Sequence, residues 1–230
     1  MSLGPDSLEK ESLRKIIKQK KYKKVLQEYA KKKIDWSHSS LFDLKKEIRL
    51  FLRNQQKERC IYCRRVIKPE RKNTNEDIEH FLDKSKKHYR KWSFSCVNLS
   101  ISCHACNFQK STKDMGDSSI KTSSSLKYNS GFYKWIHPYF HSYHQNIEIH
   151  SGWIYSIKRN APNPIQADNL IRECALDKVQ TIEKNAEDIK ETTYQITLEI
   201  SEAIRNEDYA LAKELTNKLE NYQEESWFNY

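Results

Sequence analysis

Two pairs of cysteines constrain this chain more than any other feature. Cys60 and Cys63 form one C-x-x-C motif, and Cys103 and Cys106 form another. Each motif places two thiolates on a single turn, and four thiolates at about 2.3 Å complete the tetrahedral shell of a zinc ion. A closed shell of four cysteines leaves no open position, so this zinc is expected to be structural. An iron–sulfur cluster or a redox pair is the alternative.

The segment that carries these motifs needs a metal in order to fold. Residues 60–111 are turn-rich and dense in Cys and His, and so short a stretch buries no large core by itself. Cys96 and Cys174 have no C-x-x-C partner and are expected to be plain buried thiols. Because the N-terminus has no signal-peptide pattern and the chain is rich in Lys, a cytosolic metal site is favoured over a secreted disulfide framework. We expect a cytoplasmic protein without a membrane segment, since no run approaches about 20 apolar residues.

Charge is unevenly distributed along the 230 residues, whose formal net charge is +10. Residues 1–59 carry a net charge of +9, residues 60–130 carry +7, and residues 131–230 carry −6. The basic part suits a polyphosphate, because each Lys or Arg near a phosphate releases condensed counterions. The acidic part suits a different partner. Charge alone leaves an ordinary solvated surface equally open.

Composition and periodicity divide the chain into four regions. They are a basic helical N-terminal region at 1–56, the four-cysteine core at 57–115, an aromatic-rich extension at 116–176, and acidic C-terminal helices at 177–230. Hydrophobic spacing predicts helices over 7–30, 41–56 with Ser40 as its cap, 165–174, 177–206 and 209–224. A loop is expected at 116–128, and the alternation in "IEIHSGWIYSI" predicts a hairpin that turns at Ser151-Gly152.

The acidic region contains an apolar stripe that must be buried. It consists of Ile182, Ile189, Ile196, Ile200 and Ile204, which recur at helical spacing. Two partners are open for it. One is a second protein, and the other is the next helix of the same chain, through Leu211, Leu215 and Leu219.

The core region also carries polar residues suited to phosphodiester hydrolysis. Glu79 and His80 are adjacent, Asn98 precedes the second cysteine pair, and Asn107 and Lys110 follow it. A histidine, with an unperturbed pKa of about 6.5, suits the deprotonation of water. The negative charge that develops on the phosphate needs a hard cation. The oxygens of Glu79 and Asn107 suit Mg²⁺ better than zinc.

The order of these motifs, "CIYC", then "EH", then "NLSISCHACNFQK", resembles the HNH endonucleases over about residues 58–113. The resemblance implies an α+β fold, with a zinc-stapled ββα-metal (HNH) core embedded in a mostly α-helical chain. It implies that His80 is the general base and that Asn98 tethers the loop and orients that base. It makes Glu79 and Asn107 ligands of a catalytic Mg²⁺ or Mn²⁺, although Asn107 stands where the family often has its last histidine.

The same resemblance assigns basic residues to the nucleic acid. Lys110 matches a residue expected near the scissile phosphate. The further candidates for contact with the nucleic acid are Lys84, His104 and Lys113. Asp83 and His88 are expected to be loop residues beside the groove.

A longer stretch, about residues 41–180, resembles the HNH subunit of Septu-type anti-phage defence systems and related retron-associated nucleases. The shared segments include "IEHFLDKS", "NLSISCHACN", "HPYFHSYHQNIEI" and "NLIRECALDK". Members act beside an ABC/SMC-like ATPase, so the resemblance implies such a protein partner. It also implies that His137, Pro138 and Tyr139 shape the fold or the interface.

The sequence therefore predicts a metal-dependent HNH endonuclease that hydrolyses phosphodiester bonds in DNA or RNA, as the effector of a bacterial anti-phage complex. One alternative is a stand-alone restriction-type HNH endonuclease. Another is a zinc-ribbon module that binds nucleic acid without catalysis. The combination of Glu79-His80 with Asn107 argues against this last alternative, because a pure binding module needs none of the three.

Overall fold

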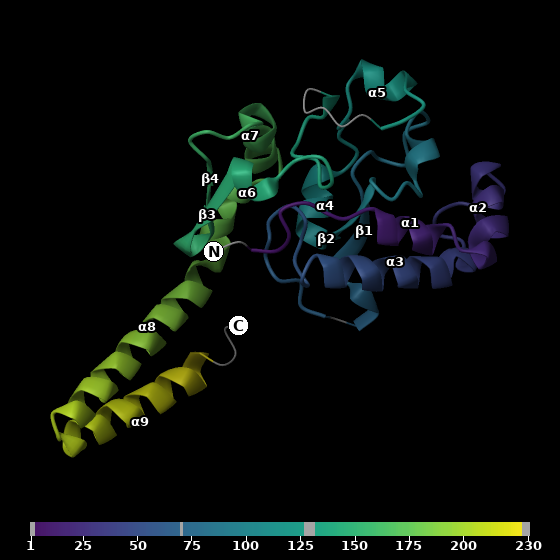
Figure 1. The fold of residues 1–230 in the computed structure, drawn as a ribbon. Helices are drawn as coiled ribbons and strands as arrows, with labels where there is room; N and C mark the ends of the chain where they lie inside the picture. Colours follow the sequence, from purple (N-terminus) through teal and green to yellow (C-terminus); the bar gives the residue numbers. More distant parts are fainter. Residues whose placement is uncertain (1–2, 70, 127–131, 227–230) are drawn as a thin grey trace. The chain divides into compact units, whose positions relative to one another are not determined.

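The structure is a computed structural model that describes residues 3–69, 71–126 and 132–226 (Figure 1). It has two compact units, Met1–Glu148 with Tyr155–Leu176 and Ile149–Ile154 with Asp177–Tyr230. The helices are α1 (Glu11–Ile17), α2 (Lys23–Ala30), α3 (Phe42–Gln55), α4 (His104–Lys110), α5 (Ser118–Thr122), α6 (Tyr143–Asn146), α7 (Pro164–Glu173), α8 (Val179–Arg205) and α9 (Tyr209–Ser226). The strands are β1 (Glu76–His80), β2 (Leu99–Cys103), β3 (Ile147–His150) and β4 (Ile154–Ile157). Helices with small two-stranded sheets make an α+β fold, as expected.

Helix α3 forms the centre of the larger unit. Leu44, Ile48 and Leu52 recur at helical spacing, are fully buried, and form the face that the rest of the unit covers. The helix packs against α1 and β2. Just beyond its end, the buried amide of Gln56 accepts a hydrogen bond from the backbone of Ile101 and donates another to it, both 2.8 Å. Gln56 thus pairs with β2 as a neighbouring strand would.

The start of α3 differs from the expectation. Ser40 was expected to cap the helix, but it lies in a 3₁₀ turn, Ser39–Leu41, that leads into α3. There the side chain of His38 accepts a hydrogen bond from the backbone of Ser40. The cap is therefore one turn earlier and is supplied by a histidine.

The helix predicted over residues 7–30 is in fact two helices, α1 and α2. Its path breaks at Gln19, whose backbone is extended. On a straight helix, Tyr22 and Tyr29 would lie about 120–140° around the axis from Ile17. After the break both tyrosines are buried with Leu13 and Ile17, and the hydroxyl of Tyr29 donates to Ser93 Oγ at 3.0 Å.

Strands β1 and β2 are followed directly by α4, and this strand–strand–helix unit carries the second cysteine pair. The strands are antiparallel, with Glu76 opposite Cys103 and His80 opposite Leu99. Helix α4 begins at the residue after β2 and contacts both strands (Figure 1). This register brings the start of β1 beside the first turn of α4, where the backbone of His104 donates to the carbonyl of Asn75 at 3.0 Å.

The aromatic-rich extension contains a helix where a loop was expected. Residues 118–122 form α5, because the side chain of Asp117 accepts from the backbone of Ile120 and Ile120 itself is fully buried. Residues 127 and 128 of the predicted loop lie outside the described residues. The hairpin is confirmed, since β3 pairs with β4 and Gly152 takes the positive φ of the turn, 77°.

The "HPY" segment is part of the fold of the larger unit. His137 is fully buried. The hydroxyl of Tyr139 donates to the carbonyl of Leu99 in β2 at 2.6 Å, and the carbonyl of Pro138 accepts from the backbone of Leu8 at 2.8 Å. These contacts join the extension and the N-terminal segment to the core.

In the smaller unit, α8 and α9 pack side by side (Figure 1). Ala203, Ala212 and Leu215 form a small core, with Ile200 packed against it. Of the predicted stripe, Ile196 is buried but Ile204 is 51% exposed, and the side chain of Ile182 lies outside the described residues. Helix α9 therefore covers part of the stripe within the chain.

Candidate metal centre and catalytic pocket

Four cysteine sulfurs cluster next to the strand–strand–helix unit. Cys60 and Cys63 lie in the turn after α3, Cys103 ends β2, and Cys106 lies in the first turn of α4. All four sulfurs lie within 4.8 Å of one another, and those of Cys63 and Cys103 are 3.9 Å apart. A zinc tetrahedron with bonds of about 2.3 Å has sulfur–sulfur edges of about 3.8 Å. The spacing therefore fits a zinc ion, which these residues could hold.

The electrostatics of the cluster also fit a metal. The neighbouring thiols lower the pKa of Cys103, and Cys103 in turn raises the pKa values of Cys63 and Cys106. Cys103 thus favours the thiolate form while Cys63 and Cys106 favour the thiol form. A cation bound by all four sulfurs would allow all of them to be thiolates. The buried guanidinium of Arg64 lies beside this cluster, stacked 3.9 Å from the ring of Tyr143. Its positive charge offsets part of the charge of a tetrathiolate site.

The two remaining cysteines are buried, as expected, and neither belongs to the cluster. Cys174 is 3% exposed, and its sulfur lies 3.9 Å from the carbonyl of Cys106. Cys96 is 8% exposed.

His80 is the last residue of β1, and one of its ring nitrogens makes a hydrogen bond while the other makes none within the described residues. Its Nε2 lies 3.1 Å from the carbonyl of Ser93, and since a carbonyl only accepts, Nε2 carries the proton. The lone pair therefore lies on Nδ1, which has no hydrogen-bond partner among the described residues and belongs to a side chain that lines the pocket. Burial, followed by the charges of Lys84 and Lys110, holds the pKa of His80 well below 6.5. The imidazole is thus neutral at pH 7, the form that a general base requires.

Asn98 tethers the segment that follows His80. Its side-chain oxygen accepts from the backbone of Leu82 at 2.7 Å, and its amide donates to the carbonyls of Leu82 and Trp92, both at 3.1 Å. The residue is 1% exposed. Asn98 therefore fixes the loop between β1 and β2 from within, and has no group left for a substrate.

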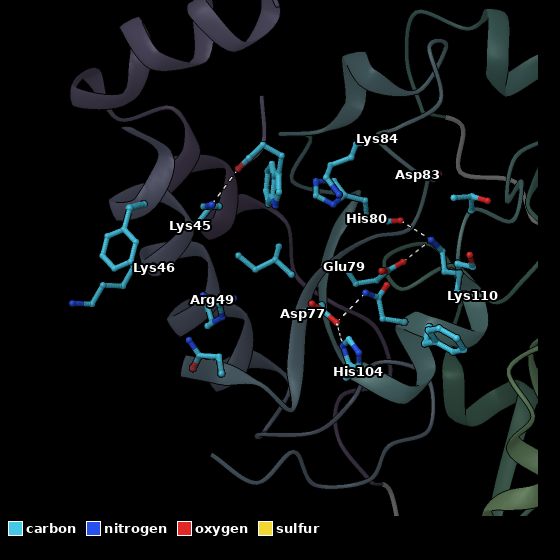
Figure 2. A pocket seen from close by; sticks show the side chains of 18 of the residues that line it. Lys45, Lys46, Arg49, Asp77, Glu79, His80, Asp83, Lys84, His104 and Lys110 are labelled. Carbon is cyan, nitrogen blue, oxygen red and sulfur yellow. Dashed lines mark hydrogen bonds and ion pairs between the residues drawn. The ribbon is translucent and has the colours of Figure 1, made fainter. Parts of the chain in front are cut away.

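Lys110 was expected near the scissile phosphate, but its side chain is buried rather than exposed to solvent. Its side chain is 2% exposed, and its ammonium lies 2.6 Å from Glu79 Oε1 and 2.9 Å from the carbonyl of His80 (Figure 2). Glu79 Oε1 also accepts from the hydroxyl of Tyr62 at 3.1 Å. The lysine is placed inward because β1 and α4 pack together and the buried Glu79 needs a counter-ion there.

Asp77 is a site residue that the sequence reasoning missed. It lies two residues before Glu79, on the same face of β1. Its Oδ2 accepts from Asn107 Nδ2 at 2.9 Å and lies 3.1 Å from His104 Nδ1 (Figure 2). The alternation of "EDIEH" along a strand could have revealed it. Asn107 Oδ1 and Glu79 Oε2 have no hydrogen bond within the described residues and remain available as hard oxygen ligands.

These residues line a pocket of about 1030 Å³ between α3 and the strand–strand–helix unit. Figure 2 shows Lys45, Lys46 and Arg49 on one side and Glu79, His80 and Lys110 on the other. Of the predicted contact residues, Lys84 and His104 line it together with Asp83. Lys113 and His88 are not among its lining residues. The α3 wall was not anticipated, because its basic residues had been assigned to no site.

Comparisons with protein-family models, with curated proteins and with solved structures found no match to this chain. No helix in the described part of the chain is both long and apolar enough to cross a membrane.

Proposed function

We propose that this chain is a metal-dependent endonuclease of the HNH (ββα-metal) type that hydrolyses phosphodiester bonds. The observation that carries the proposal is the state of His80. It is neutral, its tautomer is fixed by the carbonyl of Ser93, and its Nδ1 belongs to a side chain that lines a pocket with basic walls. A neutral imidazole with a free lone pair beside a basic pocket is suited to take a proton from water.

In this mechanism, His80 Nδ1 takes the proton of the attacking water. Asn98 holds the loop after β1, and the bond from Nε2 to Ser93 keeps the ring in one orientation. Glu79 Oε2 and Asn107 Oδ1 would hold a Mg²⁺ or Mn²⁺ ion, which supplies positive charge to the phosphate as it gains negative charge. Asp77 adds a second carboxylate beside Asn107. The four-cysteine zinc has no open position, so its role is to hold the strands and α4 together.

We further propose that the nuclease works as the effector of an anti-phage complex with an ABC/SMC-like ATPase. The sequence resemblance supports this, and so does the surface of the smaller unit. Tyr194 on α8 is 58% exposed, and Tyr209 on α9 is 69% exposed, in a region of net negative charge. Exposed aromatic residues on an acidic helical pair suit a protein partner and repel a polyphosphate.

A second candidate is a zinc-stapled module that binds nucleic acid without cleaving it. The pairing of Glu79 with Lys110 favours it, because an ammonium 2.6 Å from a carboxylate oxygen weakens the attraction of that carboxylate for a second cation. The two candidates differ in whether bound nucleic acid is cut.

The test is a cleavage assay on DNA, total RNA and tRNA with the zinc-loaded chain, with and without Mg²⁺ and with and without its genomic-neighbour ATPase. The wild-type protein should cut at least one substrate only when Mg²⁺ or Mn²⁺ is present. His80→Ala should not cut, while the exposed His150→Ala serves as the matched control and should. Equal cutting by His80→Ala would exclude the assigned base, and binding without any cutting would favour the second candidate.

A further inference from the structure

One face of α3 is built for contact with something other than the core. Phe42, Lys45, Lys46, Arg49 and Leu50 follow the spacing i, i+3, i+4, i+7 and i+8, so they form one stripe. All of them line the pocket opposite His80. Phe42 is 64% exposed and Leu50 is 61% exposed, whereas the core face of the helix is fully buried. The stripe is therefore aromatic and basic. Arg49 pairs with the buried Glu76 at 3.0 Å, whereas the exposed rings and chains of Phe42 and Leu50 are not part of the core face.

The other wall of the pocket has a second exposed aromatic residue. Phe108 on α4 is 74% exposed, and it lines the same pocket as Phe42. Two phenylalanine rings are thus presented to the pocket from two different elements. Isolated exposed apolar residues are ordinary, but two that border one basic pocket form a surface to which a planar aromatic ligand can stack.

Two lysines that line the same pocket, Lys45 and Lys84, make no ion pair within the described residues. The ammonium groups of Lys45 and Lys84 lie 5.7 and 5.5 Å from the centre of the Trp36 ring. Burial lowers the pKa of each. The Trp36 ring also lies edge-on to the His80 ring, with centres 4.4 Å apart. Both lysines line the same pocket as His80, so phosphates bound to them would lie in the pocket of the proposed base.

We propose that the pocket binds a single, unpaired nucleic-acid strand, with backbone phosphates on Lys45 and Lys84 and bases stacked on Phe42 and Phe108. The phosphates follow from two partly desolvated ammonium groups that make no ion pair within the described residues. The unpaired strand follows from the two rings, because a duplex hides the faces of its bases and a single strand exposes them. This inference rests on the proposed nuclease function for the identity of the ligand as nucleic acid.

The test measures binding of three fluorescein-labelled ligands, oligothymidylate, oligouridylate and a short duplex, to the full zinc-loaded chain. The buffer contains no Mg²⁺, so that binding is measured separately from cleavage. Phe42→Ala and Phe108→Ala should each weaken single-strand binding about 5- to 150-fold and leave duplex binding unchanged. Lys45→Ala and Lys84→Ala should each lower the slope of log affinity against log salt by about 0.7. Tyr209→Ala and Lys31→Ala, at exposed positions outside the pocket, are the matched controls and should change neither quantity.

The outcomes separate this inference from the proposed function. Equal affinity for duplex and single strand, with no effect of the phenylalanine substitutions, would overturn it even if the protein cleaves nucleic acid. Binding with the expected dependence on all four residues would support it even if no substrate is cut with Mg²⁺, and in that case only the proposed hydrolysis would fail.

Discussion

The buried pair of Lys110 and Glu79 offers the sharpest test of how this pocket is built. The ammonium lies 2.6 Å from the carboxylate, and the two side chains are 2% and 4% exposed. In Lys110→Met the apolar part of the side chain remains, but Glu79 is left as a buried charge that, within the described residues, accepts a hydrogen bond only from the Tyr62 hydroxyl. Breaking a buried pair from one side costs about 3–5 kcal/mol. That is a large share of the roughly 5–15 kcal/mol that keeps a typical domain folded.

The measurement is urea unfolding of the zinc-loaded protein in Mg²⁺-free buffer, followed by tryptophan fluorescence. The double variant Glu79→Gln/Lys110→Met should recover part of the loss, with a coupling energy of about 1–3 kcal/mol. Lys21→Met breaks a pair of similar length with Glu47, 2.5 Å, on an exposed surface, and should change little because water already screens it. If Lys110→Met unfolds at the urea concentration of the wild-type protein, the buried-pair reasoning is wrong.

The same variant reports on the catalytic metal. A divalent cation that binds the folded state stabilises it in proportion to its affinity and concentration. Because Lys110→Met removes the competing ammonium from Glu79, Mg²⁺ should stabilise this variant more than it stabilises the wild-type protein. Equal stabilisation of both proteins by Mg²⁺ would mean that Glu79 does not face a cation site.

Four further predictions follow from the structure. Cys103→Ser should lose its zinc and unfold the core, because structural zinc contributes on the order of 10 kcal/mol of folding free energy; elemental analysis that finds no metal in folded wild-type protein would contradict this. His80→Ala should keep its fold and zinc and lose about 10²- to 10⁴-fold in cleavage rate. Burial lowers the pKa of His141 from about 6.5 to about 4. The contribution of neutral His141 to stability is therefore complete above pH 6.5 and is lost as the pH falls toward 4. Between these pH values, the unfolding free energy of His141→Asn should change with pH less steeply than that of the wild-type protein, by about 1.4 kcal/mol per pH unit. A chain without residues 177–230 should stay folded, keep basal cleavage and lose the ATPase in co-purification, and retained binding would exclude the partner role of α8 and α9.

The features that the sequence predicted correctly are those whose partners are local. A C-x-x-C motif brings its two sulfurs together on one turn, so the cluster of Cys60 and Cys63 could be expected before any tertiary contact was known. The hairpin turn at Gly152 and the helices α7, α8 and α9 follow equally local rules of turn chemistry and apolar period. Asn98 closes the loop between two neighbouring strands, as a local contact can, while its role in orienting the base stays a prediction.

The features that the sequence did not predict depend on partners that are distant along the chain. Lys110 could be recognised as basic from the sequence. Its buried ion pair with Glu79 depends on how β1 packs against α4, which the sequence alone does not show. Trp36 lies in a polar linker with no periodic pattern, and only the folded chain shows that it touches His80 and two lysines. The break between α1 and α2 accompanies the burial of Tyr29, whose hydroxyl donates to Ser93, a residue 64 positions away along the chain.

On the proposed mechanism, the two metals have different tasks, and the contacts of Glu79 explain why they would fail differently. Without zinc, the four clustered cysteines, three of them buried, compete for protons, and the metal bonds that would join the turn after α3 to α4 are lost. Without Mg²⁺, Lys110 still neutralises Glu79, so the core keeps a charge-balanced form. Removal of Mg²⁺ by a selective chelator should therefore stop cleavage reversibly with the fold intact, whereas removal of zinc should unfold the strand–strand–helix unit. A protein that loses its structure when only Mg²⁺ is removed would show that Lys110 does not balance this charge.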